Sequence, residues 1–440
     1  MAPNERKRTQ RERLLRGMVE VANRSGYAGA SVSTVIAQAG VSRPTFYEYF
    51  TDRDDCFRSS IEHVQQQLLT RITDALEGVP PHGALAHTVR ALVEYACEEP
   101  VAARFLMGES MAGGSGALDT RDRAIAQIAA VVERAQQEAS DGDVVPDLAL
   151  AVALRSVYRM LATRLRRGEL TISKLTDDLL AWLAAYDRPS CERRWQALTP
   201  GPAPARSPHV PDVPIQQSPS VLPPGRPRLP AREIAENHRL RILYATARLA
   251  EQKGYLATKV ADITTLARID GSAFYRHFAD KQEAFSAVHE LGFQHVMDVT
   301  AEAFFAPEGW PRRSWEAGRA LTQLLQDNPL VAHVGFVEAY TVGSSAVQRI
   351  EDSHVAFVFF LQEGLVQRPE SPPPSRVAME AIVAAIFEIV YIKVRQPGEP
   401  EIAAMLPHVA HMWLTPFLGI EEADAFIDAQ MRTEHEDEHQ

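Results

Sequence analysis

Hydrophobic positions along most of the chain recur at helical spacing. Leu14, Leu15, Met18, Val21 and Ala22 form one such stripe, because apolar residues three and four positions apart share one face of a helix. No run of alternating apolar and polar residues is long enough to predict a strand. The pattern therefore predicts an all-α protein.

Glycine and proline breaks divide this helical pattern. In residues 53–190 the breaks at 78–81, 113–116, 141–142 and 187–189 predict about five helices. The second half follows the same plan, with breaks near residues 307, 329, 343, 368–374, 396–400 and 419. The longest apolar stretch, residues 377–394, contains two Glu and one Lys, which favours a buried helix over a membrane span.

One segment of the chain occurs twice. Residues 46–53 read FYEYFTDR, and residues 274–281, which lie 228 positions later, read FYRHFADK. The same offset pairs Gly26-Tyr27 with Gly254-Tyr255, and it holds without a gap for roughly 45 residues around each copy. A long unit that is seen only twice indicates a duplicated domain rather than a solenoid.

The first copy has the layout of a helix-turn-helix. A basic helix over residues 6–25 stops at Gly26, Ser31 is a good N-cap for a short helix, Gly40 turns the chain, and Ser42 can cap a third helix. In DNA-binding proteins with this layout, the N-terminal end of the last helix enters the major groove. The first copy is therefore predicted to bind DNA.

The third helix offers side chains for base and phosphate contacts. Arg43 suits base reading, because a guanidinium donates bidentately to guanine O6 and N7. Phe46 and Phe50, four residues apart, are expected to face the core. The other predicted DNA-binding residues of this copy, several of them suited to phosphate, are Ser31, Ser42, Pro44, Thr45, Tyr47, Tyr49 and Arg53.

The second copy departs from the first at the turn. Arg268 stands where the first copy has Gly40, so it must adopt a conformation that glycine takes easily. The third helix opens with Gly271-Ser272-Ala273, which offers no long side chain to a base edge. This copy is expected to position the protein more than to specify sequence, and a copy that has lost DNA binding is the alternative. The candidate contacts are Ser272, Tyr275, Arg276, His277 and Lys281, with Arg226 and Arg228 as a basic arm for the minor groove.

Charge supports this placement. The net charge of −11 argues at first against a nucleic-acid partner. Yet residues 1–56 contain nine Lys and Arg against seven Asp and Glu, and residues 226–290 contain eleven against eight. The basic segments coincide with the repeats, and location matters more than the sum.

These motifs resemble the tetracycline-repressor (TetR) family of bacterial transcriptional regulators. The resemblance rests on Gly26-Tyr27, on AGVS at residues 39–42 and on TFYEYF at residues 45–50, and the second copy is similar through GRPR at 225–228 and FYRHF at 274–278. It implies a DNA-binding regulator, usually a repressor, whose last two long helices pair subunits. Here those helices are residues 147–167 with 173–186, and residues 375–395 with 399–418.

The resemblance implies two complete units in one chain. They are expected to form an intrachain pseudo-dimer that reads an asymmetric site on double-stranded DNA, and further oligomerisation is left open. The predicted domains are a helix-turn-helix at 1–56, a core at 57–197, a Pro-rich linker at 198–230, a second helix-turn-helix at 231–286, a second core at 287–430 and an acidic tail at 431–440.

The second core is rich in aromatic residues, and two interpretations stay open. It is plain core, or it holds a small apolar effector. The candidate lining residues are Phe336, Tyr340, Phe357, Phe360, Phe387 and Tyr391.

Other chemistry is not predicted. Cys56, Cys97 and Cys191 form no C-x-x-C pair, so a disulfide framework or thiolate zinc site is not expected and a cytoplasmic location fits best. We expect no metal, cofactor, membrane partner or enzymatic activity. The alternative to a regulator is a ligand-binding or protein-interaction scaffold whose helix-turn-helix regions no longer bind DNA.

Overall fold

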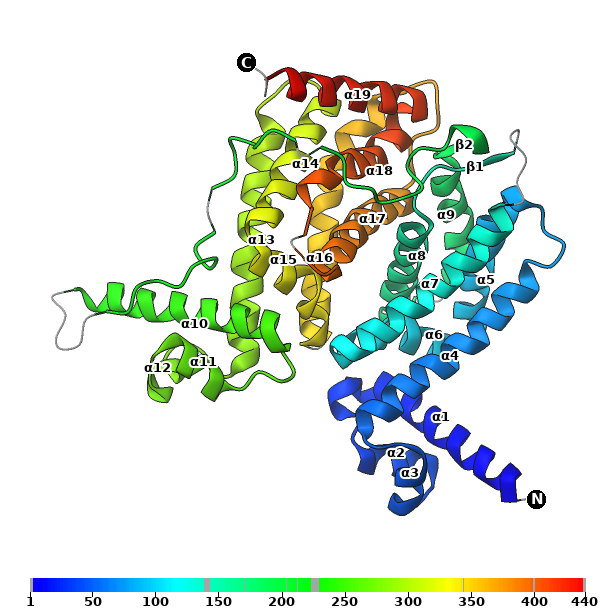
Figure 1. The fold of residues 1–440 in the computed structure, drawn as a ribbon, viewed down its shortest axis with the longest axis vertical. Helices are drawn as coiled ribbons and strands as arrows, with labels where there is room; N and C mark the ends of the chain where they lie inside the picture. The colour runs from blue at the N-terminus through cyan, green and yellow to red at the C-terminus, as the bar shows by residue number, and fades with distance from the viewer. Residues whose placement is uncertain are drawn as a thin grey trace. The chain divides into compact units, whose positions relative to one another are not determined.

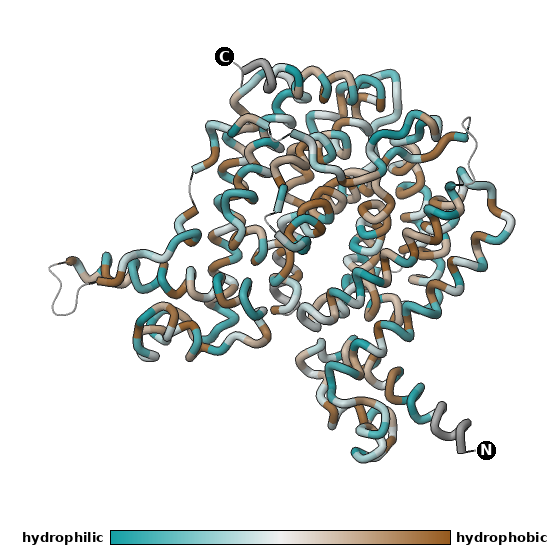
Figure 2. Tube along the Cα trace, in the orientation of Figure 1, coloured by the Kyte–Doolittle hydropathy of each residue, from teal (hydrophilic) through white to brown (hydrophobic). Residues whose placement is uncertain are grey.

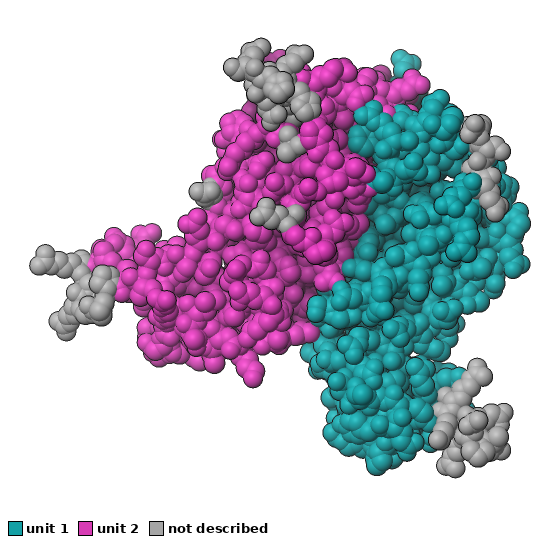
Figure 3. Space-filling view, in the orientation of Figure 1, with its two compact units in different colours: residues 1–197, 370–385 teal, residues 198–369, 386–440 magenta. Residues whose placement is uncertain are grey.

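The computed structural model describes residues 3–137, 143–169, 171–202, 204–211, 213–222, 229–342, 344–398 and 400–437. The prediction of an all-α protein is confirmed, and the helices follow one another along the chain as Figure 1 shows. They form two compact units, coloured separately in Figure 3: unit 1 comprises residues 1–197 and 370–385, and unit 2 comprises residues 198–369 and 386–440.

Unit 1 begins with three helices, which we call headpiece 1. They are α1 (Pro3–Gly29), α2 (Val32–Ala39) and α3 (Arg43–Tyr49). The predicted stop at Gly26 appears as a kink within α1, where Gly26 has φ 68° and ψ 171°. The apolar stripe that begins at Leu14 is buried against the rest of the headpiece and the core.

The core of unit 1 follows headpiece 1. Its helices are α4 (Arg53–Ala75), η1 (Pro81–Gly83), α5 (Ala84–Glu98), α6 (Pro100–Met107), η2 (Glu109–Gly113), α7 (Ser115–Gln137), α8 (Leu150–Arg166), η3 (Ile172–Lys174), α9 (Leu175–Ala184) and η4 (Ser190–Glu192). The sequence prediction missed the break before α6. Pro100 causes it, because proline has no N–H to continue the preceding helix.

Unit 1 also contains a short ladder that the sequence did not predict. Strands β1 (Val144–Pro146) and β2 (Asp187–Pro189) pair antiparallel, with Val144 opposite Pro189. Three residues are too few to show the alternation by which a strand is recognised.

Unit 2 repeats the plan of unit 1. Headpiece 2 comprises α10 (Ala231–Lys253), α11 (Val260–Ala267) and α12 (Gly271–Tyr275). The helices that follow are α13 (Lys281–Phe305), α14 (Trp310–Asp327), α15 (Pro329–Phe336), η5 (Glu338–Thr341), α16 (Ser344–Val358), η6 (Phe359–Val366), α17 (Arg376–Arg395), η7 (Ala403–Met405), α18 (Leu406–Leu418) and α19 (Ile420–Asp437). The predicted acidic tail is therefore helical through Asp437.

Helix α17 is divided between the units. Its residues 381–391 are all buried, and it is a strongly hydrophobic segment in Figure 2. Residues 376–385 count with unit 1, where Glu380 accepts a hydrogen bond from Arg164 of α8 at 2.5 Å. Residues 386–395 count with unit 2. A helix that is apolar on most sides needs cover from more than one direction.

The described residues of the predicted linker pack within unit 2. Val210, Val213 and Ile215 are buried, and Arg206 forms an ion pair with Asp327 at 2.9 Å. Sparse apolar residues are enough to hold an extended segment in the grooves of a helical core. Among the described helices, none has the length and apolar character needed to cross a membrane.

Candidate nucleic-acid interface

Headpiece 1 is built by local signals that the sequence displays. The Ser31 hydroxyl accepts from the Thr34 N–H at 3.2 Å and caps α2. Gly40 ends α2 in the left-handed region, with φ 60° and ψ 45°. Ser42 caps α3 by accepting from the Thr45 N–H at 3.3 Å. All three roles confirm the predicted local structure.

Headpiece 2 reaches the same geometry with different residues. Arg268 takes the left-handed conformation, with φ 52° and ψ 50°, as the comparison with Gly40 requires. Asp270 replaces the serine cap of the third helix, and its Oδ1 accepts from the Ala273 N–H at 2.8 Å. The two headpieces therefore share a backbone plan while differing in the chemistry of the turn.

Aromatic packing inside the headpieces is also shared. Phe46 and Phe274 are fully buried. The Tyr27 and Phe57 rings lie 4.8 Å apart, and the equivalent Tyr255 and Phe285 rings lie 5.1 Å apart. Burial of these rings fixes the outward direction of the neighbouring positions on each third helix.

Three predicted contact residues of headpiece 1 are exposed on α3: Arg43, Pro44 and Tyr47. The Arg43 guanidinium carbon lies 5.8 Å from the centroid of the Tyr47 ring, and its Nη2 lies 3.5 Å from the Tyr47 hydroxyl. Arg43 makes no ion pair with any residue that the structure describes. Its guanidinium is therefore presented outward with most of its donors uncommitted, as base reading requires.

Three other predicted contacts of headpiece 1 have partners inside the protein. Arg53 donates to the Tyr27 hydroxyl at 2.8 Å and to Asp54 at 3.0 Å. Tyr49 donates to Gln10 at 3.4 Å. Thr45 shares a 2.8 Å hydrogen bond with the Ser42 hydroxyl. Their phosphate contacts stay predictions, and Arg53 would have to give up charged partners to make one.

The predicted residues of headpiece 2 form a surface around α12. Tyr275 is 61% exposed, and Arg276 is exposed with its Nη1 donating to Ser272 at 3.2 Å. His277 packs edge-on against His238 of α10, with 6.5 Å between ring centroids. Burial and the neighbouring positive groups, His238 and then Arg276 and Arg239, lower the pKa of His277. The histidine is thus biased toward its neutral form.

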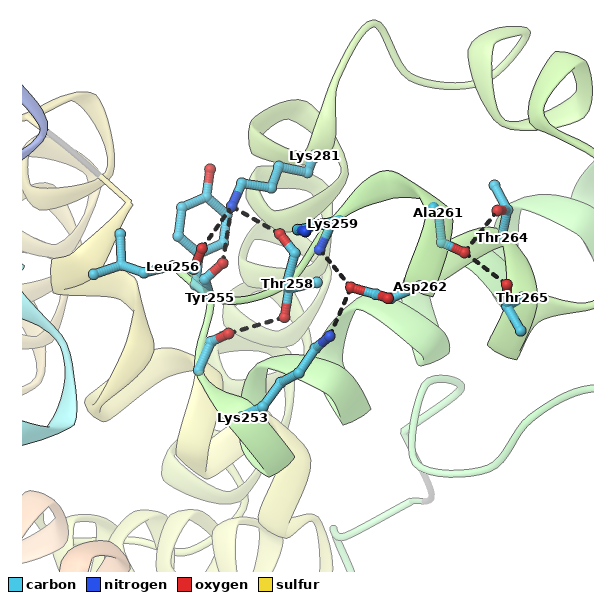
Figure 4. Close-up of polar contacts among 11 residues, drawn as sticks. Lys253, Tyr255, Leu256, Thr258, Lys259, Ala261, Asp262, Thr264, Thr265 and Lys281 are labelled. Carbon is cyan, nitrogen blue, oxygen red and sulfur yellow. Dashed lines mark hydrogen bonds and ion pairs between the residues drawn. The ribbon is translucent and has the colours of Figure 1, made fainter.

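Lys281, the first residue of α13, is bonded to the loop of headpiece 2 that follows α10, as Figure 4 shows. Its Nζ donates to the carbonyl oxygens of Tyr255 at 3.0 Å, Thr258 at 2.9 Å and Leu256 at 3.4 Å. It also lies 4.3 Å from the centroid of the Tyr255 ring. The predicted phosphate contact would have to replace these bonds. In this structure Lys281 stabilises the loop after α10.

The charge at the tip of the third helix differs between the headpieces. Headpiece 1 has a neutral cap followed by Arg43, whereas headpiece 2 has Asp270 followed by Gly271. Hydrogen bonds from Ser272 and then from the Ala273 N–H lower the pKa of Asp270, so this tip carries a negative charge. The sequence analysis missed the charge at this position. The signal was present in the repeat alignment, where an aspartate is paired with Ser42.

Arg226 and Arg228, predicted as a basic arm, lie outside the described residues. Nothing in the structure bears on that prediction.

Comparison with known proteins identifies the headpieces. A family model described as bacterial regulatory proteins of the tetR family matches residues 14–59 and again residues 242–288. Both headpieces are TetR-family helix-turn-helix domains. The match covers the TetR headpieces and the start of the helix after each, and not the rest of either core.

The similar proteins match only part of the chain. An uncharacterized HTH-type transcriptional regulator of Mycobacterium tuberculosis, matched in two strains, is 30% identical over 133 residues, which make up 30% of this chain and 56% of that protein. The chain therefore spans about half the length of these relatives. The crystal structure of the transcriptional regulator FadR from Bacillus subtilis, in complex with stearoyl-CoA, is 17% identical with a TM-score of 0.36, covering 39% of this chain and 96% of that one.

An apolar cavity lies behind the second TetR headpiece, within unit 2. Three of the predicted lining residues, Phe336, Phe357 and Phe387, line it. The other three, Tyr340, Phe360 and Tyr391, are buried in the same core but are not part of the lining. The contribution of α13 was not predicted, because most of its lining residues are small or apolar and look like ordinary core; they are Val288, Gly292, Phe293 and Val296, with His289 beside them.

Proposed function

We propose that this chain is a DNA-binding transcriptional regulator, acting as a repressor, whose two TetR headpieces read an asymmetric site on double-stranded DNA. One observation carries the proposal: equivalent positions at the tips of the two third helices hold different chemistry. Arg43 in headpiece 1 is matched by Gly271 in headpiece 2, and Ser42 is matched by Asp270. Different side chains at the point of base contact favour different half-sites.

The division of labour between the headpieces follows from these residues. Headpiece 1 supplies the base-reading guanidinium of Arg43. Headpiece 2 offers Tyr275 and Arg276 for contacts to the DNA backbone, while the Asp270 carboxylate repels phosphate and accepts hydrogen bonds only from donors such as cytosine N4. Headpiece 1 therefore dominates specificity, and headpiece 2 restricts orientation.

We further propose that a small apolar effector releases the protein from DNA through unit 2. The cavity bordered by α13, α15, α16 and α17 has a volume of about 40 Å³, which is close to the space of a single water molecule. An effector must therefore open it by displacing side chains of the lining. Release requires that the effector bind the opened core more tightly, typically by about 1 to 3 kcal/mol.

The test is footprinting of the purified protein on genomic DNA fragments across a range of salt. A regulator gives a protected site whose two halves differ in sequence, and its affinity falls steeply as salt rises. A palindromic site would contradict the asymmetric reading. Binding that is absent, or that shows no sequence preference at any salt concentration, would favour a protein-interaction scaffold.

A further inference from the structure

A buried carboxylate connects the core of unit 2 to headpiece 2. Glu338, at the start of η5, is 5% exposed. Its Oε2 accepts from the backbone N–H of Tyr255 at 2.8 Å and from the Thr341 hydroxyl at 3.2 Å, and its Oε1 lies 3.6 Å from His333 Nε2. A buried carboxylate is costly unless it is hydrogen-bonded, so these contacts hold its position closely.

The bonded N–H belongs to the loop that orients headpiece 2. Gly254 ends α10 with φ 81°, and Tyr255 is the first residue of the loop to α11. The same loop is held through its carbonyl groups by Lys281. Glu338 thus binds the loop through a backbone N–H, and Lys281 binds it through backbone carbonyl groups. A shift of Glu338 therefore moves the loop directly.

Glu338 is also placed to respond to the apolar cavity. Val331, Val334 and Phe336 of α15 line the cavity, and Glu338 lies two residues beyond Phe336. On the facing helix, a methyl group added at Gly292 would lie 3.1 Å from Val331. A group that enlarges the cavity by pushing on Val331 therefore displaces α15, and with it the carboxylate that holds the Tyr255 N–H.

Unit 1 contains the counterpart of this arrangement without the bond. Glu109 lies nine residues after the proline that begins α6, as Glu338 does after the proline that begins α15. It lies 3.8 Å from Arg104, and no hydrogen bond joins it to Tyr27 among the described residues of headpiece 1. Burial raises the pKa of Glu109 above its usual range, as expected for a carboxylate that lacks close donors.

From this comparison we infer that Glu338 is the positioning residue that transmits movement of α15 to headpiece 2, and that Glu109, at the matching position of unit 1, shows the same arrangement with the bond to the headpiece broken. The inference rests on the proposed function, since it assigns the route by which an effector changes DNA binding. It also assigns regulation to one headpiece: headpiece 2 is coupled to its core through this carboxylate, and headpiece 1 is not.

The test is amide hydrogen exchange in the full chain, followed at Tyr255 and at buried amides of α14. Glu338→Ala should increase exchange at Tyr255 by about 5- to 100-fold, the effect of leaving a buried donor unsatisfied, while α14 stays protected. Glu338→Gln, which keeps an acceptor oxygen, should fall between this variant and the unchanged protein. Glu109→Ala is the matched control and should leave exchange at Tyr27 unchanged.

Coupling to the cavity is tested by Gly292→Ala, whose added methyl group presses on Val331. It should increase exchange at Tyr255 in the unchanged protein but add nothing when Glu338 is already alanine, which makes the pair non-additive. Additive effects would overturn the inference. So would an unaltered Tyr255, or a loss of protection that extends through α14.

The exchange experiment does not depend on DNA. If the unchanged chain binds no DNA, the proposed function fails while the exchange result still decides whether the carboxylate links core and headpiece. If DNA binds, Glu338→Ala should remove footprint protection over the half-site of headpiece 2 only. Loss over both halves would count against the assignment to one headpiece.

Discussion

Replacing Arg43 by alanine tests the assignment of base reading to headpiece 1. The side chain is exposed, and among the described residues its contacts are with Tyr47, at 5.8 Å between guanidinium carbon and ring centroid. Substitution at such a position changes folding stability by about 0.5 kcal/mol or less. A loss of DNA affinity in Arg43→Ala therefore reports on the complex and not on the fold.

The magnitude follows from the geometry of the guanidinium. A bidentate contact to guanine discriminates by about 1 to 3 kcal/mol, which corresponds to about a 5- to 150-fold loss of affinity. Leaving the Tyr47 ring costs about 0.5 to 1 kcal/mol at an exposed site. If Arg43 must leave the ring to reach DNA, the loss should fall in the lower half of this range.

The assay is competition binding against operators that differ at one base pair each. Arg43→Ala should lose its preference at a single base pair while keeping its preferences elsewhere. Arg43→Lys is the matched control, because it keeps the charge but lacks the rigid planar fork of donors of the guanidinium. It should relax the same base pair with an unchanged salt dependence. Equal loss of affinity for every operator would refute base reading and assign Arg43 to phosphate.

Three further variants test headpiece 2, one of them with a matched change in headpiece 1. Burial, followed by neighbouring arginines, lowers the pKa of His238, and the pKa of His277 is also lowered. DNA phosphates favour the protonated form of each histidine. Affinity for the second half-site should therefore rise as pH falls from 7 toward 5, by up to about tenfold per pH unit for each proton bound. The double variant H238Q/H277Y, which installs the pair found in headpiece 1, should show a flat pH profile by fluorescence anisotropy, and a slope that survives would exclude these histidines. Arg268→Gly should stabilise headpiece 2 by about 0.5 to 1 kcal/mol in hydrogen exchange, because relief of the left-handed conformation outweighs the added flexibility of the unfolded chain. Gly40→Ala should destabilise headpiece 1. A change in stability of the same sign in both variants would refute the conformational argument. If Lys281 only stabilises its loop, Lys281→Ala should weaken DNA binding without changing the salt dependence. A slope of log affinity against log salt concentration that is smaller by about 0.9 would instead indicate a lost phosphate contact.

The parts of the interface that the sequence predicted are those decided by nearest neighbours. The caps at Ser31 and Ser42, and the left-handed turn at Gly40, depend on residues at most four positions away. The unusual conformation of Arg268 was predictable because the repeat supplies a second example of the same turn. Local chemistry and the internal alignment therefore carried most of the headpiece prediction.

The parts that were missed depend on distant partners. Lys281 looks like a surface cation until the carbonyl groups of residues 255–258 are placed around it. The bond from Tyr255 to Glu338 spans 83 positions, and the contact of Arg164 with Glu380 spans 216. Periodicity in one sequence does not reveal such pairs, because each side chain alone satisfies the rules of an ordinary helix surface.

Fusion of two TetR headpieces in one chain explains why their differences persist together. In a two-fold dimer every substitution appears in both subunits, so an aspartate at the tip of the third helix or a strained arginine in the turn would be imposed on both half-sites. In a fused chain Asp270 and Arg268 affect one headpiece, while the other keeps Arg43 and Gly40, the residues on which the proposed base reading depends. The same separation lets Glu338 bind the Tyr255 N–H of one headpiece, while Glu109, at the matching position of the other unit, makes no such bond among the described residues. The variant D270S/G271R places the residue types of Ser42 and Arg43 at the tip of α12. If the differences between the headpieces were the result of drift alone, this variant should leave operator preference unaltered. The proposed asymmetric site requires that the variant create a new base preference at the second half-site.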